Sequence, residues 1–142
     1  MRRLEEHPAA WYTVENLYTG EMALSMKSRF KQMRDNYVIR QAQGVELPEF
    51  PAEAVCRRRI RFSGRVQKVG FRLEVCQLAE RLGLTGWCMN LENGDVLAEF
   101  QGTAQRIEFL VAFMESLKRI KIREKQVEEL EVLSTEADFK KK

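Results

Sequence analysis

The residues from Gly64 to Arg72 combine two features that an anion site needs, a turn bracketed by glycines and a nearby cation. The sequence predicts a strand over residues 58–63 before this turn and a helix over residues 71–82 after it. Glycine lets backbone N–H groups converge, and a helix N-terminus favours an anion. Arg72 lies in the first helical turn, where the helix dipole favours a carboxylate over a guanidinium. We therefore predict that Arg72 binds an anion, although turns bracketed by two glycines are also common in proteins that bind none.

A second polar residue, Asn90, lies near the end of the next predicted strand, residues 85–91. Strand alternation places it on the face opposite Trp87 and Met89. Its carboxamide both donates and accepts hydrogen bonds, so it can hold a water molecule in line with a phosphorus atom, but it cannot act as a base. Taken singly, Arg72 would be read as a surface helix residue and Asn90 as a turn former. Together, behind the loop and ahead of a hairpin, they favour one shared site.

Two stretches of the sequence resemble the acylphosphatase family. The family's loop reads Gly-Arg-Val-Gln-Gly-Val-Gly-Phe-Arg, and residues 64–72 differ from it only at Lys68. The second stretch is similar to the family's Gly-Trp-Val-Arg-Asn with its following hairpin, and here it reads Gly86-Trp87-Cys88-Met89-Asn90, then Asn93-Gly94-Asp95-Val96. The resemblance covers about residues 56–142 and leaves the first fifty or so residues unexplained.

The resemblance implies hydrolysis of acyl phosphates, which are carboxylic–phosphoric anhydrides, to a carboxylate and inorganic phosphate, with no metal or cofactor. It assigns phosphate binding to Arg72 and the orientation of the attacking water to Asn90. A carboxylate is a good leaving group, so positioning and charge stabilisation can supply most of the rate. The resemblance assigns the phosphate-binding loop to Gly64, Arg65, Val66, Gln67, Lys68, Val69, Gly70 and Phe71. The implied partners are a small-molecule acyl phosphate and phosphate, and the sequence does not indicate which acyl group is used.

Two departures from the family pattern bear on efficiency rather than on reaction type. Lys68 stands where the family has its middle glycine. If that position needs a positive φ, lysine costs on the order of 1 kcal/mol, and its ammonium group would also add a cation beside the phosphate. Met89 stands where the family often has a basic residue, which removes one contact.

The alternative to an enzyme is a non-catalytic anion-binding or protein-interaction module, because one fold supports many functions. Nucleic-acid binding is the least favoured class. The net charge of +3 is small, and the arginine-rich strand offers no exposed aromatic side chain of the kind that sheet-based RNA readers use. The arginines around the loop either face solvent or create a positive field that attracts a small dianion.

Cysteine and histidine usage excludes several kinds of site. Cys56, Cys76 and Cys88 lack metal-ligand spacing, and their odd number argues against a disulfide framework, so we expect reduced and mostly buried thiols. The one histidine, His7, lies far from the motifs, which excludes a histidine base or a histidine metal site there. The N-terminus has no long apolar run, so we expect no signal peptide, no membrane span and a cytoplasmic protein.

The first part of the chain is predicted to be a helical extension, residues 1–43, followed by a linker over 44–54 that contains Pro48 and Pro51. Within the helical stretch, apolar residues at spacings of three and four share one face: Met22, Met26, Phe30, Met33 and Tyr37. We expect this face to pack against the rest of the chain or a second copy. Docking of a partner or a membrane surface through residues 21–42 is the alternative.

The remaining domain, residues 55–142, is predicted to have the element order βαββαβ. This order gives an α+β, ferredoxin-like sandwich, an antiparallel sheet with two helices on one face, which is also the fold that the resemblance implies. Residues 118–125 read as a basic connector and 127–133 as the fourth strand, with a short final strand near Phe139. The predicted core side chains are Ile60, Phe62, Phe71, Val75, Leu78, Ala79, Leu82, Val96, Ala98, Phe100, Ile107, Leu110, Val111, Met114 and Leu117.

Overall fold

A computed structural model describes residues 20–142, with side chains from residue 25 onward. The chain divides into two compact units between Asn36 and Tyr37, and the sheet domain belongs to the unit Tyr37–Lys142. Helix α2, Gly20–Gln43, therefore contributes its last turns to the sheet unit. The domain boundary predicted at residues 44–54 stays a prediction. The part of the predicted helical extension that covers residues 1–19 lies outside the described residues.

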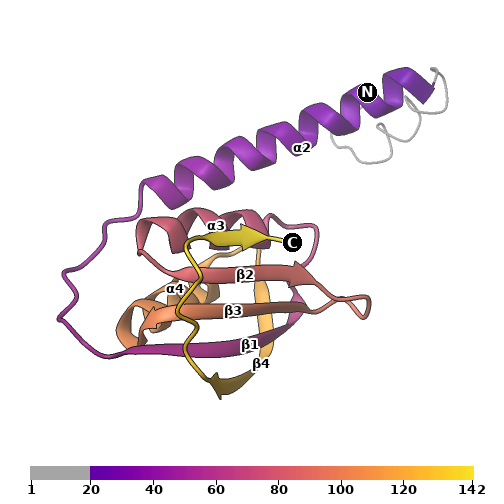
Figure 1. Ribbon diagram of the computed structural model, residues 1–142. Coiled ribbons are helices and arrows are strands. Elements are labelled where there is room, and N and C mark those ends of the chain that lie inside the picture. The colour runs from indigo at the N-terminus through magenta and orange to yellow at the C-terminus, as the bar shows by residue number, and fades with distance from the viewer. Residues whose placement is uncertain (1–19) are drawn as a thin grey trace. The chain divides into compact units, whose positions relative to one another are not determined.

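The sheet domain has the predicted ferredoxin-like arrangement (Figure 1). Its strands lie in the order β4-β1-β3-β2-β5, and helices α3 and α4 cover one face of the sheet. Strand β1 is antiparallel to both β3 and β4, and β2 is antiparallel to β3. The short last strand, β5, pairs parallel with β2, so the sheet is mixed rather than fully antiparallel. The element bounds are β1 Val55–Arg65, α3 Phe71–Arg81, β2 Thr85–Asn90, β3 Val96–Thr103, α4 Ala104–Ser116, β4 Lys121–Leu130 and β5 Phe139–Lys141.

The core lies between this face of the sheet and the two helices, and all the core side chains predicted from the sequence are buried there. Alternation along β1 sends Ile60 and Phe62 inward, while the apolar stripe of α3 packs on them. The rings of Phe62 and Phe71 lie 5.1 Å apart between centroids. Because Phe71 is the first residue of α3, this contact fixes the start of the helix on the sheet beside the loop.

Strand β4 begins earlier than the sequence indicates. Residues 118–125 were predicted to be a basic connector, but Lys121 already pairs with Arg65 of β1. The charged composition fits an edge strand whose side chains are almost all exposed, and pairing with β1 satisfies the backbone. Local composition did not predict this part of β4, because the strand forms by pairing with β1 and not through the strand propensity of its own side chains.

Three side chains of the predicted apolar face of α2 are exposed. Phe30, Met33 and Tyr37 are 47%, 65% and 53% accessible, whereas Val38 and Ala42 in the last turns are fully buried. Packing of this face against the rest of the chain or a second copy, and partner docking through it, stay predictions. No helix in residues 20–142 combines the length and apolar character needed to cross a bilayer.

Candidate functional site

The stretch from the end of β1 to the start of α3 contains three residues with a positive φ. Gly64, Lys68 and Gly70 have φ angles of 124°, 65° and 78°. At Gly64, where the β1–β4 register shifts, an added Cβ would lie 2.1 Å from the Lys121 carbonyl oxygen, so only glycine fits. Lys68 adopts the positive φ considered in the sequence analysis, and the strain of about 1 kcal/mol applies there.

The loop presents amide groups that the fold does not use. None of the hydrogen bonds in residues 20–142 takes the backbone N–H of Val66, Gln67, Val69 or Gly70 as its donor. Helix α3 follows directly, with Gly70 as an N-cap that makes no side-chain bond. Free N–H groups of a loop together with a helix N-terminus form an arrangement that attracts anions. The buried side chains of Val66 and Phe71 attach this loop to the core at two points.

Arg72 is held at one edge of its guanidinium only. Its Nη1 donates to the carbonyl oxygen of Lys142 at 2.7 Å. Lys142 is itself fixed against β2, because its N–H donates to the Cys88 carbonyl at 2.8 Å and its Nζ lies 4.5 Å from the centroid of the Trp87 ring. Among the described residues, no acceptor contacts Nε or Nη2 of Arg72. These two nitrogens form the planar fork that suits two oxygens of a phosphate.

Asn90 is the last residue of β2 and carries an orphaned acceptor. Its Oδ1 is buried and has no hydrogen-bond partner among residues 20–142. A buried polar atom without a partner is unfavourable and rare, so it indicates a group kept for a ligand. The chain beyond Asn90 is fixed, because the Leu91 N–H donates to the Asp95 carbonyl at 2.8 Å to close the hairpin.

The side chain of Gln67 joins the loop to this hairpin. Its Nε2 donates to the carbonyl oxygens of Leu91 and Asp95, each at 2.8 Å. The Asp95 carboxylate in turn accepts from Arg61 Nε at 2.7 Å, and this hydrogen bond lowers the pKa of Asp95. The structure thus ties the loop that precedes Arg72 to the strand end that carries Asn90. Gln67 was predicted only as a loop residue, because local spacing does not reveal that its side chain bridges to the hairpin.

Comparisons with known proteins agree with this geometry. The acylphosphatase family profile matches residues 58–141, which is more than half of the chain. The chain belongs to the acylphosphatase family. An acylphosphatase from Thermoplasma volcanium is 45% identical over 56 residues, which are 39% of this chain and 62% of the relative. One from a Nostoc species is 43% identical over 61 residues, covering 43% of this chain and 60% of the relative. The chain therefore spans about three fifths of the length of these curated relatives.

Solved acylphosphatase structures share the fold. The crystal structure of acylphosphatase from Bacillus subtilis has a TM-score of 0.56 and 29% identity, covering 60% of this chain and 96% of that one. The structure of an acylphosphatase from Coxiella burnetii has a TM-score of 0.57 and 31% identity, covering 62% and 93%.

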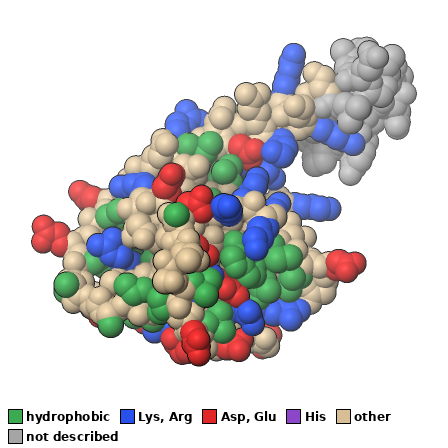
Figure 2. Space-filling model, viewed as in Figure 1, with side chains coloured by type: hydrophobic (Ala, Val, Ile, Leu, Met, Phe, Trp, Pro, Cys, Tyr) green, Lys and Arg blue, Asp and Glu red, His purple; other side chains and the backbone are tan. Residues whose placement is uncertain are grey.

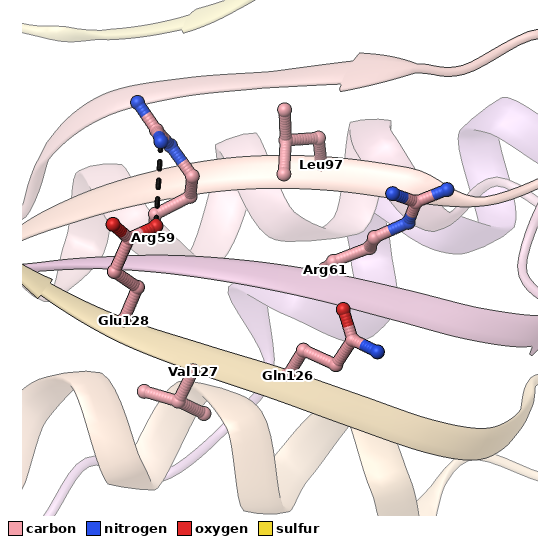
Figure 3. Close-up of a pocket in the computed structure, with 6 residues that line it drawn as sticks. All are labelled: Arg59, Arg61, Leu97, Gln126, Val127 and Glu128. Carbon is pink, nitrogen blue, oxygen red and sulfur yellow. Dashed lines mark hydrogen bonds and ion pairs between the residues drawn. The ribbon is translucent and has the colours of Figure 1, made fainter.

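In this acylphosphatase family member, four arginines of β1 are paired with carboxylates and do not form a field of unpaired cations: Arg57, Arg58, Arg59 and Arg61. Arg57 is 2% exposed and is bound to Glu99 and Glu136. Arg59 and Arg61 lie on the sheet face opposite the helices, beside a hollow of about 440 Å³ whose lining also includes Leu97, Gln126, Val127 and Glu128 (Figure 3). Arg59 pairs there with Glu128, Arg61 pairs with Asp95, and acidic and basic side chains are mixed over the surface in view (Figure 2). The carboxylate partners neutralise these arginines, so their presence in β1 is explained by ion pairs and not by attraction of a substrate anion.

Two further residues near the loop were missed by the sequence analysis. Glu74 of α3 is fully buried and pairs with Arg119, which follows α4. Burial raises the pKa of the Glu74 carboxyl, and the hydrogen bond from Arg119 opposes that shift. A signal was available, because helical spacing from Phe71 places Glu74 in the buried stripe, and a carboxylate there needs a cation.

The three cysteines are free thiols, and Cys88 alone is fully buried. Burial raises the pKa of the Cys76 thiol to about 11, so it stays protonated at neutral pH. Within residues 20–142, no group of three or more His, Cys, Asp or Glu side chains is arranged to hold a metal ion.

Proposed function

We propose that this protein hydrolyses acyl phosphates to a carboxylate and inorganic phosphate. Membership of the acylphosphatase family supports the reaction class. The observation that carries the proposal is the state of Arg72, whose Nη1 is anchored on the Lys142 carbonyl while its Nε and Nη2 have no acceptor within residues 20–142. An arginine held by one edge and open at the other is pre-organised to bind two phosphate oxygens, so little conformational entropy is lost on binding.

The loop amides supply the remaining phosphate contacts in this proposal. The loop combines the unused N–H groups of Val66, Gln67, Val69 and Gly70 with the N-terminal end of α3, and both favour a dianion. Donors aimed at the phosphoryl oxygens stabilise the charge that builds up as the bond to the leaving group breaks. Because these donors belong to the backbone and are fixed by the buried Val66 and Phe71, they need no reorganisation during the reaction.

Asn90 positions the attacking water. Its buried Oδ1 accepts a hydrogen bond from the water, which directs a lone pair of the water oxygen toward phosphorus. The water oxygen bonds to phosphorus, and the bond from phosphorus to the bridging oxygen breaks. The bridging oxygen leaves as part of a carboxylate, and both water protons remain with the inorganic phosphate. No general base is required, because the leaving group is a weak base and positioning carries the rate.

The test is hydrolysis of an aromatic acyl phosphate, followed by the loss of ultraviolet absorbance, in the presence of a metal chelator. We expect turnover by the unaltered protein, and a fall of about a hundredfold or more for Arg72→Ala and for Asn90→Ala, as for the loss of a transition-state donor. Inorganic phosphate should inhibit competitively, and Arg72→Ala should weaken that inhibition.

Matched variants distinguish loss of chemistry from loss of folding. Arg81→Ala removes the arginine at the other end of α3, which also donates to backbone carbonyls, those of Ala42 and Val45. Asn93→Ala removes an exposed asparagine of the same hairpin. Both controls should retain turnover. Absence of turnover in folded protein that still binds inorganic phosphate would overturn the hydrolase proposal and favour the non-catalytic anion-binding module.

A further inference from the structure

The guanidinium of Arg119 contacts three separate segments of the sheet unit. Its Nε donates to the carbonyl oxygen of Val69 in the loop at 2.7 Å, and its Nη2 donates to the carboxylate of Glu74 on α3. Its Nη1 donates to Oε1 of Gln41 in the last turns of α2 at 2.7 Å. The ring of Tyr37, one turn earlier on α2, lies 5.9 Å from the guanidinium carbon. One side chain therefore links the end of α2, the start of α3 and the loop.

The contact with Val69 determines how the next peptide is oriented. The peptide unit is planar and trans, so the Val69 oxygen and the Gly70 N–H point in opposite directions. Fixing the oxygen on Arg119 therefore aims the Gly70 N–H away from Arg119, and keeps the carbonyl from turning toward the side where loop amides are free. Gly70 has a φ of 78° and no Cβ, so this peptide could otherwise rotate at small cost. A rotated peptide would present an oxygen instead of a donor to an anion.

Arg119 is itself held by the two acceptors on the helices. Glu74 is fully buried, with 0% of its surface accessible to solvent. Its carboxylate therefore has little freedom to move, and its hydrogen bond with the guanidinium is charge-assisted. Gln41 comes from α2 and is the weaker, neutral partner. Because the three acceptors share one planar guanidinium, Gln41 on α2 and the Val69 carbonyl are connected through a single charged group.

We infer that Arg119 is a positioning residue for the phosphate loop, and that it couples the last turns of α2 to the affinity of the site for phosphate. The inference rests on the proposed function for its ligand, but its effect on the loop does not depend on turnover. Arg119 does not contact the reacting atoms and acts through the peptide between Val69 and Gly70. In this inference, a change in the position of Gln41 at the end of α2 alters the affinity of the site for phosphate.

A matched control separates this role from general stabilisation. Arg106 is also partly buried, donates to a backbone carbonyl, that of Leu82 at 2.8 Å, and stacks 4.9 Å from the centroid of the Phe50 ring. It thus repeats the carbonyl-plus-aromatic contacts of Arg119 at the opposite end of α3. Replacing either arginine by methionine removes a carbonyl hydrogen bond and an aromatic contact, but Arg119→Met also leaves Glu74 unpaired, and it alone releases the loop. Gln41→Ala, which keeps the pair of Arg119 and Glu74, separates these two effects.

The experiment uses the full chain and inorganic phosphate as the probe. For Arg119→Met we expect phosphate affinity to fall about tenfold, which corresponds to about 1.4 kcal/mol. KM for an acyl phosphate should rise by a similar factor with a smaller change in kcat, whereas Asn90→Ala should mainly lower kcat. Arg119→Lys should restore part of the affinity, because an ammonium can reach Val69 or Glu74 but lacks the planar fork. Gln41→Ala keeps the buried pair and removes one hydrogen bond to the guanidinium, so it should weaken phosphate binding by a smaller factor, about threefold.

A second measurement reads the loop without a ligand. The amide NMR shift and hydrogen exchange of Gly70 should change in Arg119→Met and in Gln41→Ala, and should match the unaltered protein in Arg106→Met. If Gly70 and phosphate affinity respond equally to the Arg119 and Arg106 changes, or to neither, the inference is wrong. If the unaltered protein neither binds phosphate nor turns over, the proposed function fails, while the response of Gly70 still decides whether Arg119 positions the loop.

Discussion

Gln67 and Leu91 are joined by a 2.8 Å hydrogen bond from the side-chain amide of Gln67 to the backbone carbonyl of Leu91, which ties the loop to the strand end that carries Asn90. The same nitrogen reaches the Asp95 carbonyl, which completes a bridge between the two sequence motifs. In the proposed reaction, this bridge sets the position of the water relative to the bound phosphate. A small error in that position is costly, because the rate depends on alignment of the reacting atoms.

Replacement of Gln67 by leucine should therefore impair turnover more than stability. For Gln67→Leu we expect kcat to fall about tenfold or more from misalignment, while the free energy of unfolding falls by about 1–2 kcal/mol for two lost hydrogen bonds. Gln101→Leu is the control, since Gln101 likewise bridges to backbone, donating to the Leu133 carbonyl at 2.7 Å, but lies away from the loop. Steady-state kinetics with urea denaturation checks the prediction, and equal kinetic losses in both variants would contradict it.

Lys68 occupies a left-handed position that glycine would adopt without strain. In Lys68→Gly, relief of strain of about 1–2 kcal/mol is offset by about 0.5–1 kcal/mol of added entropy in the unfolded chain, so the free energy of unfolding should rise by about 1 kcal/mol. Lys68→Ala keeps the strain and removes the ammonium. Denaturant midpoints should therefore rank the glycine variant above the alanine variant, and the reverse order would refute a backbone cost at this position.

Arg57 is the buried cation of the sheet face opposite the helices, and its loss should be severe. Arg57→Met leaves Glu99 and Glu136 without their shared partner, and we expect a loss of about 3 kcal/mol in the free energy of unfolding, as for a broken buried pair. The adjacent Arg58 pairs with glutamates that are 63% and 64% exposed, so Arg58→Met should cost under about 1 kcal/mol. Thermal and urea unfolding would show whether the two neighbours differ in this way.

Asp95 should make the stability of the hairpin depend on acid pH. The hydrogen bond from Arg61 is the main cause that lowers the pKa of this carboxyl in the folded protein below its ordinary value of 3.8. Its stabilising contribution is therefore complete above that ordinary value, and is lost as the pH falls through the lower folded value. Unfolding curves recorded between pH 5 and pH 2 should show that Asp95→Asn loses less stability on acidification than the unaltered protein.

The control for Asp95 is Glu92→Gln, which removes one exposed carboxylate from the same turn. Unfolding curves recorded at several pH values should give a pH dependence close to that of the unaltered protein for Glu92→Gln and a flatter one for Asp95→Asn. Parallel behaviour of the two variants would show that the Arg61–Asp95 pair has no special contribution.

The sequence by itself determined the fold class, the core and the positions of the two motifs. These properties follow from local rules: period-two alternation in strands, apolar stripes on α3 and α4, and glycines where the chain must turn. Ile60, Phe62, Phe71 and Val75 could be assigned to the core because each occupies a regular position on an element whose period is visible in a short window. The loop and its resemblance to a known family were likewise contained in consecutive residues.

Only the tertiary structure decided which polar groups meet. The arginines of β1 gave no sign of their partners, because Glu99 and Glu136 that hold Arg57 come from distant parts of the chain. The extent of β4 depended on pairing with β1, and the exposure of Met33 on α2 could not be read from its period. The bridge from Gln67 to the hairpin and the contacts of Arg119 with Val69, Glu74 and Gln41 are also long-range. Hydrogen bonds are short and directional, so they depend on three-dimensional placement that no sequence period encodes.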